Sequence, residues 1–159
     1  MTILEVTDDD FAAMLQGDAS VRPGVTQPPG GVDKPDVLEH VRRMATKLRR
    51  DGFAGGHWMM IANGEVVGLC GFKEPPSGDG EIELGYGVAL SRRRRGYATA
   101  AVAAVIESTR LHSAVRAIVA STAVSNVASQ RVLARNGFER VGTRFDPDDG
   151  EVLLWRKRL

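Results

Sequence analysis

The stretch EIELGYGVALSRRRRGYA, residues 81–98, joins a strand pattern to a basic turn and the start of a helix. Apolar residues alternate from Ile82 to Leu90, which predicts a strand over Glu81–Leu90 with one apolar face. Glycine weakens a strand and is typical where another group approaches the backbone closely. An open cleft, or else a solvated face with a bulge, explains the residues on the opposite face: Glu81, Glu83, Gly85 and Gly87.

The strand continues through Ser91 into the basic turn, and an Ala-rich helix is predicted from about Arg94 to Leu111. The first amides of a helix have no intrahelical partner and carry partial positive charge. Gly96 and Ala98 lack bulk, so a phosphate can lie against these amides while arginines add charge-assisted hydrogen bonds. The turn therefore predicts a pyrophosphate site. A P-loop and a dinucleotide fingerprint are both excluded, because Gly-Lys-Ser/Thr and a third spaced glycine are missing.

Outward from this segment, the signals predict helices that bracket a mixed, mostly antiparallel sheet. Asn63-Gly64 between two apolar runs indicates a hairpin, since both residues tolerate positive φ. Residues 22–35 are too rich in Pro and Gly for regular structure, after which Asp33 offers an N-cap and Pro35 a first helical turn. We expect further helices over Phe11–Gln16, from Pro35 to an end at Gly52, and over Val127–Asn136. Further strands are expected over Thr2–Val6, His57–Ala62, Glu65–Phe72, Ala114–Ser121, Phe138–Phe145 and Glu151–Arg158.

Composition narrows the class of protein. The 159 residues suit one domain over 1–159, and a net charge of +1 implies no general attraction to nucleic acid or membrane. Cys70 is the only cysteine, so neither an intrachain disulfide nor a zinc site of paired cysteines can form, and an apolar strand predicts that it is a core residue. With no signal peptide at the start and no apolar run of about 18 residues, we expect a cytoplasmic protein.

Three motifs resemble those of a known family. Arg93-x-x-Gly96-x-Ala98 resembles the Q/R-x-x-G-x-G/A signature of the GNAT superfamily of N-acetyltransferases, although Arg94 stands where the family often has glycine. The branch that contains ribosomal-protein N-terminal acetyltransferases is similar at Glu83-Leu-Gly-Tyr86, Gly96-Tyr-Ala-Thr99, Asn126-Val-Ala-Ser129, Leu133 and Asn136-Gly-Phe138. The resemblance covers residues 81–145. It implies an α+β fold (α/β three-layer) whose mixed, mostly antiparallel sheet has six to seven strands and about four flanking helices.

The resemblance also implies acetyl-CoA as co-substrate, without a metal, between the splayed strands Glu81–Leu90 and Ala114–Ser121. Main-chain groups of Val88, Ala89 and Leu90 would pair with the pantetheine arm, and an amide near Val88 would face the thioester oxygen. Asn126 and Ser129 would contact coenzyme A from the next helix, where each also suits helix capping. The pyrophosphate would be held by the turn, at Arg93, Arg94, Arg95, Gly96, Tyr97, Ala98 and Thr99.

Two residues are candidates for catalysis. Glu83 is the candidate base, directly or through a water, with Glu81 in reserve and a surface carboxylate or structural ion pair as the alternative. Many family members place a tyrosine four residues before the final glycine, where Leu133 stands here. By resemblance, Ser129 takes the role beside the sulfur instead.

The predicted function is transfer of an acetyl group to a primary amine of a small molecule or a protein N-terminus, by direct attack in a ternary complex. The acceptor would be lined by residues 17–35, 74–80 and 145–150. We expect no nucleic acid or membrane partner and either a monomer or a homodimer. Without the tyrosine, a non-catalytic acyl-CoA-binding module is the alternative. RNA binding through Arg92–Arg95 is another, although no aromatic platform or RNP-like motif accompanies it.

Overall fold

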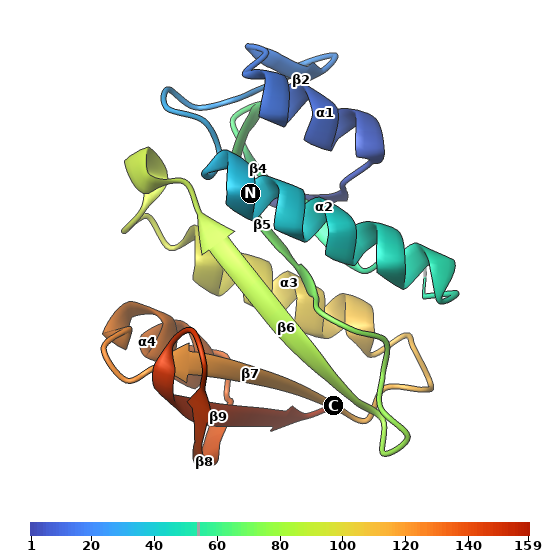
Figure 1. Cartoon of the computed structure of the whole chain (residues 1–159), viewed down its shortest axis with the longest axis vertical. Helices are drawn as coiled ribbons and strands as arrows, with labels where there is room; N and C mark the ends of the chain where they lie inside the picture. Colours follow the sequence, from blue (N-terminus) through green and yellow to red (C-terminus); the bar gives the residue numbers. More distant parts are fainter. Residues whose placement is uncertain (54) are drawn as a thin grey trace.

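The computed structural model describes residues 1–53 and 55–159. Seven strands follow one another across a mixed sheet in this described part (Figure 1). In spatial order they are β1 (Thr2–Glu5), β4 (His57–Ala62), β5 (Glu65–Phe72), β6 (Glu81–Val88), β7 (Ala117–Ala123), β9 (Gly150–Arg158) and β8 (Glu139–Asp146). Neighbours are antiparallel, except that β6 and β7 are parallel, which agrees with the predicted mixed sheet.

The sheet has nine described strands, more than the predicted six to seven. The two additional strands, β2 (Ser20–Arg22) and β3 (Val25–Thr26), form a short hairpin, and β3 also pairs with β5. The prediction of an irregular loop over residues 22–35 is therefore wrong at its start. Gly24 adopts a φ of 77°, which lets a Pro- and Gly-rich segment reverse between two short strands.

The helices of the described residues are α1 (Asp8–Gln16), α2 (Pro35–Arg50), the 3-10 helix η1 (Leu90–Arg92), α3 (Tyr97–Thr109) and α4 (Val127–Arg135). α3 begins later than the predicted Arg94. The φ angles of Arg94 and Gly96 are 65° and 79°, so neither residue can belong to a right-handed helix. α2 begins at Pro35 as predicted, but its N-cap is Lys34 and not Asp33.

Two predicted strands, β6 and β7, have ends shifted by two or more residues. β6 stops at Val88, so Leu90 leaves the apolar face and is 80% exposed, whereas Ala89 is buried. β7 begins at Ala117 and not at Ala114, because a turn closed by the bond from the amide of Val115 to the carbonyl of His112 precedes it. The predicted hairpin at Asn63-Gly64 is confirmed, with φ angles of 52° and 73°.

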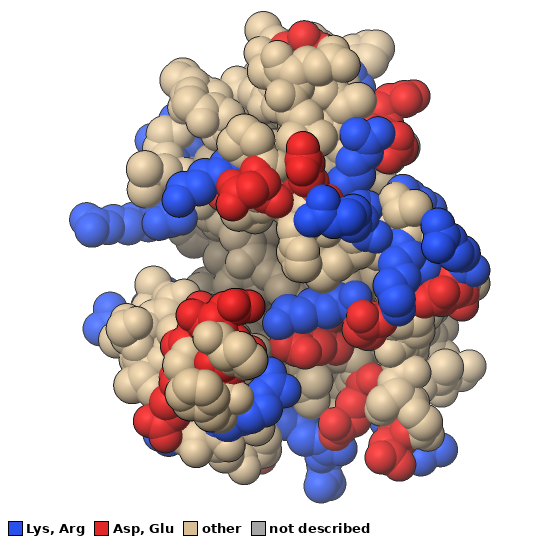
Figure 2. Space-filling model, viewed as in Figure 1, with Lys and Arg blue, Asp and Glu red and all other residues tan. Residues whose placement is uncertain are grey.

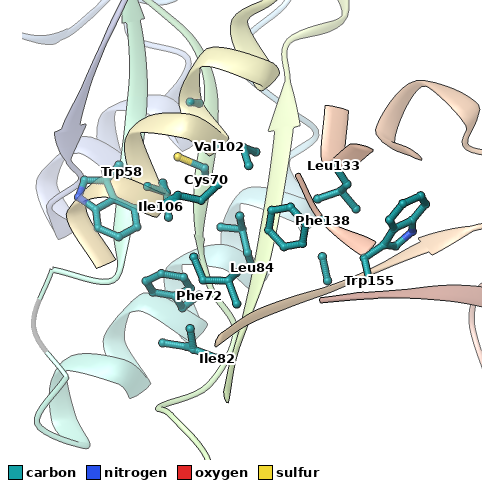
Figure 3. Packing of buried hydrophobic residues seen from close by; sticks show 14 of the residues in the cluster. Trp58, Cys70, Phe72, Ile82, Leu84, Val102, Ile106, Leu133, Phe138 and Trp155 are labelled. Atoms are coloured by element: carbon teal, nitrogen blue, oxygen red, sulfur yellow. The ribbon is translucent and has the colours of Figure 1, made fainter. Parts of the chain in front are cut away.

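Alternate residues of β4 and β5 point into two apolar cores. α1 and α2 cover one core, which includes Met59 and Leu69, and α2 crosses in front of the sheet in Figure 1. α3 covers the other, which includes Cys70 as predicted (Figure 3). Further members of the α3 core are Trp58, Phe72, Ile82, Leu84, Val102, Ile106, Leu133, Phe138 and Trp155. No helix of the described residues has the length and apolarity to cross a bilayer.

Candidate active site

β6 and β7 separate along their length. They pair only from Glu81 to Glu83, opposite Ala117 to Val119. Beyond Glu83 the edge of β6 that faces β7 has no strand partner among the residues that the structure describes. Figure 1 shows the two strands diverging, and Figure 2 shows a hollow between the two halves of the molecule. The predicted splayed pair is therefore confirmed.

The start of α3 lies beyond the end of β6. The first hydrogen bond of the helix runs from the amide of Ala100 to the carbonyl of Gly96, so the amides of Tyr97, Ala98 and Thr99 have no helical acceptor. The N-cap Gly96 brings no side chain to cap them, and it is exposed. This helix start is open to an anion, as predicted. The left-handed φ of Arg94 also accounts for the glycine that the family often has at this position.

The arginine run divides into two pairs. Arg92 holds η1 to β5 through two hydrogen bonds to the carboxylate of Glu65, at 2.5 and 2.9 Å. Arg93 donates from Nε to the carbonyl of Val88 at 3.1 Å, which ties the turn back to the strand. Arg94 and Arg95 are exposed and form no ion pair within 1–53 and 55–159. The first two arginines thus shape the turn, and the last two are available to a ligand.

Two of the main-chain groups predicted to pair with pantetheine are already engaged. The carbonyl of Val88 accepts from Arg93, and the amide of Ala89 donates to the carbonyl of Val67 at 2.9 Å. Leu90 lies in η1, past the open edge. The free edge of β6 therefore ends near Val88.

The two carboxylates of β6 both form ion pairs. Oε1 of Glu83 accepts from Nζ of Lys73 at 2.6 Å and from the hydroxyl of Ser121, on β7, at 3.0 Å. Its side chain is 29% exposed, at the point where β6 leaves β7. Glu81 accepts from Nε of Arg156 at 2.6 Å and lies where the strands are still paired. Only Glu83 adjoins the open region.

α4 brings Ser129 to β6. The side chain of Asn126 accepts from the amide of Ser129 at 3.1 Å, so Asn126 caps the helix. The Ser129 hydroxyl lies 2.8 Å from that of Tyr86, which also donates to the Ser129 carbonyl at 3.2 Å. Burial raises the pKa of Tyr86 above its usual value, although the hydrogen bond with Ser129 lowers it in part. The alternation of the strand predicted Tyr86 on the apolar face but did not predict this contact with Ser129.

The end of α4 is fixed to α3. Nδ2 of Asn136 donates to the carbonyl of Thr99 at 3.2 Å, and Phe138 is buried in the α3 core. The Asn-Gly-Phe motif therefore orients α4 against the first turn of α3. This link and the contact between Tyr86 and Ser129 bring the predicted residues of α3, α4 and β6 together around the open end of the strands.

On the α2 side of β6 lies a pocket of about 160 Å³. Gly85 and Gly87 form part of its floor and have no side chains that would fill it. A Cβ atom on Gly87 would lie 3.5 Å from Oδ2 of Asp33. Asp33 therefore projects over β6, a position that its predicted role as an N-cap did not suggest. The walls are largely apolar and are formed by Val32, Val37, Val41, Met44, Leu69, Cys70 and parts of His57, Gly71, Lys73 and Tyr86.

His57 is the buried polar residue of this pocket. Its side chain stacks close to Gly71, only 5% of the residue is exposed, and Nδ1 has no hydrogen-bond partner in the described part of the chain. Burial, with a smaller effect of the Arg49 charge, lowers the pKa of His57 to about 4. The imidazole is therefore neutral at physiological pH. No sequence motif distinguishes His57 from His40 and His112.

Comparison with solved structures places the fold. The ribosomal-protein alpha-N acetyltransferase RimL in complex with coenzyme A superposes with a TM-score of 0.74 and 17% identity, over 99% of this chain and 93% of that one. Aminoglycoside acetyltransferase AAC(6')-Ib with coenzyme A gives a TM-score of 0.71 and 19% identity, over 99% and 94%. At these identities the likeness concerns the fold.

Sequence comparison is more specific. The uncharacterized N-acetyltransferase YjdG of Bacillus subtilis (strain 168) is 34% identical over 83 residues, which span 51% of this chain and about half, 49%, of that protein. The model of the acetyltransferase (GNAT) domain matches residues 1–139, which include the splayed strands, the arginine turn and all four α-helices described above. With its motifs, its topology and this match in agreement, the chain belongs to the acetyltransferase (GNAT) domain family.

Proposed function

We propose that this protein transfers an acetyl group from acetyl-CoA to a primary amine of a small molecule or a protein N-terminus. The observation that carries the proposal is the separation of β6 from β7 beside the exposed start of α3. The free edge of β6 suits an extended pantetheine arm, which would pair like an added strand. The amides from Arg93 to Thr99, with Arg94 and Arg95, suit the pyrophosphate.

The residues at the divergence point supply the proton transfers. An ammonium has no lone pair, so Glu83 removes a proton from it, directly or through a water. The amine nitrogen then bonds to the thioester carbonyl carbon as the carbon–sulfur bond breaks, with an amide near Val88 facing the carbonyl oxygen, and the nitrogen loses its second proton to solvent water. Ser129 gives the leaving sulfur a hydrogen bond or a proton. Tyr86 holds the Ser129 hydroxyl in place through the bond of 2.8 Å.

The remaining parts of the proposal concern the protein as a whole. We propose that residues 1–159 act as one acetyltransferase domain, as a monomer or a homodimer in the cytoplasm, and need neither nucleic acid nor membrane. The contacts of the arginine run support the proposal that no nucleic acid is needed, because the side chains of Arg92 and Arg93 bond within the fold. A steep salt-dependent affinity for RNA would contradict it.

Two measurements test the activity. Isothermal titration measures binding of acetyl-CoA, and release of the free CoA thiol measures transfer to a panel of primary amines. We expect binding and amine-dependent thiol release. Binding without release on every amine would favour a non-catalytic module, and absence of binding would refute the site at α3.

A further inference from the structure

The pocket on the α2 side of β6 has a wall that no other part of the described chain covers. Val37, Val41 and Met44 lie on the face of α2 that borders it, and all three are partly exposed. Leu69 lies on the opposite wall. Apolar side chains that border a pocket become more stable when an apolar group displaces water from them.

The charge at the pocket is divided between two places. The ammonium of Lys73 forms an ion pair with Glu83, with 2.6 Å between Nζ and Oε1. Asp33 lies over Gly87, forms no ion pair with the described residues, and accepts one hydrogen bond from them, from the amide of Lys34 to Oδ1. Its Oδ2 is therefore a free anionic atom beside the end of the open edge of β6. A cationic group of a ligand suits this position.

The size of the pocket limits the apolar group. A cavity of about 150 Å³ in a protein core holds one benzene ring, and this pocket measures about 160 Å³. One ring or one branched aliphatic chain fits. A polyhydroxylated sugar with several ammonium groups would leave polar groups against the apolar wall, which costs binding energy, and Asp33 is the one carboxylate among the described residues that line the pocket.

We infer that the acceptor is a primary amine that carries one apolar group of this size, bound with its ammonium at Asp33 and its apolar group between α2 and Leu69. The inference rests on the proposed acetyltransferase function and specifies its acceptor. A free arylalkylamine and a peptide whose first residue is hydrophobic share this chemistry. Asp33 binds the ammonium before the nitrogen reaches Glu83 and the thioester.

The acceptor panel should contain ethylamine, 3-methylbutylamine, 2-phenylethylamine, a tetrapeptide beginning with leucine, spermidine and kanamycin. Burying one such apolar group contributes a factor of about 10 to 100. We therefore expect kcat/KM to rise by about that factor from ethylamine to 2-phenylethylamine. The peptide shows whether the natural source is an N-terminus or a free amine. Preference for spermidine or kanamycin would overturn the inference and leave the transferase function intact, whereas thiol release on no amine would overturn the function itself.

Substitutions locate the effect in the pocket. Val41→Thr keeps the side-chain shape but places a hydroxyl on the wall, and Asp33→Asn removes the anion. We expect Val41→Thr to lower kcat/KM for 2-phenylethylamine and not for ethylamine, and Asp33→Asn to raise KM for both, with KM for acetyl-CoA unchanged. Val141→Thr, at a 57% exposed position of β8, is the matched control. Equal losses in Val41→Thr and Val141→Thr would overturn the assignment, as would a wild-type KM for the amine in Asp33→Asn.

Discussion

The phenol oxygen of Tyr86, on β6, lies 2.8 Å from the hydroxyl oxygen of Ser129, on α4. The contact joins the two elements on either side of the open end of β6 and β7. Leu133, which stands at the position of the family's frequent tyrosine, is fully buried in the α3 core. A phenol thus lies beside Ser129 although it comes from a strand and not from α4.

This contact predicts that Tyr86 positions Ser129. Tyr86→Phe removes one hydroxyl and should lower kcat by about tenfold, whereas Ser129→Ala should lower it by about 10- to 100-fold, because proton transfer is impaired. KM for acetyl-CoA should stay within about twofold. If the two residues act as a unit, the double variant is no slower than Ser129→Ala alone. Losses that multiply in the double variant would show that Tyr86 acts independently of Ser129.

Glu83→Gln should reduce turnover by about 100-fold or more while acetyl-CoA affinity stays nearly unchanged, because the amide cannot accept the amine proton. Titration calorimetry and thiol release measure the two quantities separately. Wild-type turnover in this variant would remove Glu83 from the mechanism.

Glu81→Gln is the matched comparison, since Glu81 lies on the same face two residues earlier and is also ion-paired. We expect turnover close to wild type, because Glu81 lies where β6 and β7 are still paired. The opposite pattern, with Glu81→Gln inactive and Glu83→Gln active, would exchange the two assignments.

Much of the fold follows from local sequence signals. The β4–β5 hairpin was predictable because Asn63 and Gly64 both tolerate the positive φ that they adopt. The hairpin of β2 and β3 was not, because two or three residues per strand carry no detectable alternation and the pairing of β3 depends on the distant Glu65. Local propensity cannot report a contact between residues 39 positions apart.

The candidate site divides in the same way. The turn from Arg93 to Thr99 was predictable because its residues are consecutive in the sequence. Its small side chains, at Gly96 and Ala98, leave room for a phosphate beside the helix amides. Tyr86 was missed, and Asp33 was predicted only as an N-cap and as one residue of the acceptor-lining segment 17–35, since each gains its contact at the site only from packing. The ion pair between Lys73 and Glu83 likewise depends on the register of β5 against β6.

Gly96→Val should weaken binding of acetyl-CoA severely. A Cβ atom at Gly96 meets no atom within 4 Å, so the change acts through the φ of 79° and through the space beside the helix amides, and not through a clash with the fold. A left-handed φ costs a non-glycine residue about 1 to 2 kcal/mol. Gly17→Val is the matched control, because Gly17 has a φ of 74°, no atom within 4 Å, and a position at the end of α1.

Both variants should lose similar thermal stability, but only Gly96→Val should lose acetyl-CoA affinity in titration calorimetry. Retained affinity in a folded Gly96→Val protein would refute the proposed pyrophosphate site. Equal loss in both variants would instead attribute the effect to general destabilisation.

His57 predicts how stability depends on pH. Burial lowers its pKa to about 4 in the folded protein, whereas an unfolded chain has the ordinary value near 6.5. Between these values the unfolded state binds more protons, so the free energy of unfolding rises with pH. The contribution is complete above pH 6.5, decreases as the pH falls from 6.5 towards 4, and amounts to about 3 kcal/mol for this difference in pKa.

His57→Asn keeps a polar group near the Nδ1 position but does not titrate in this range. Urea unfolding at about pH 7.5, 6.0, 5.0 and 4.5 should therefore show a shallower decrease in the free energy of unfolding for this variant than for the wild type. His40→Asn, at an exposed position of α2, is the control variant for the loss of a histidine. If His57→Asn and the wild type lose stability in parallel below pH 6.5, His57 is not neutral and buried in the folded protein.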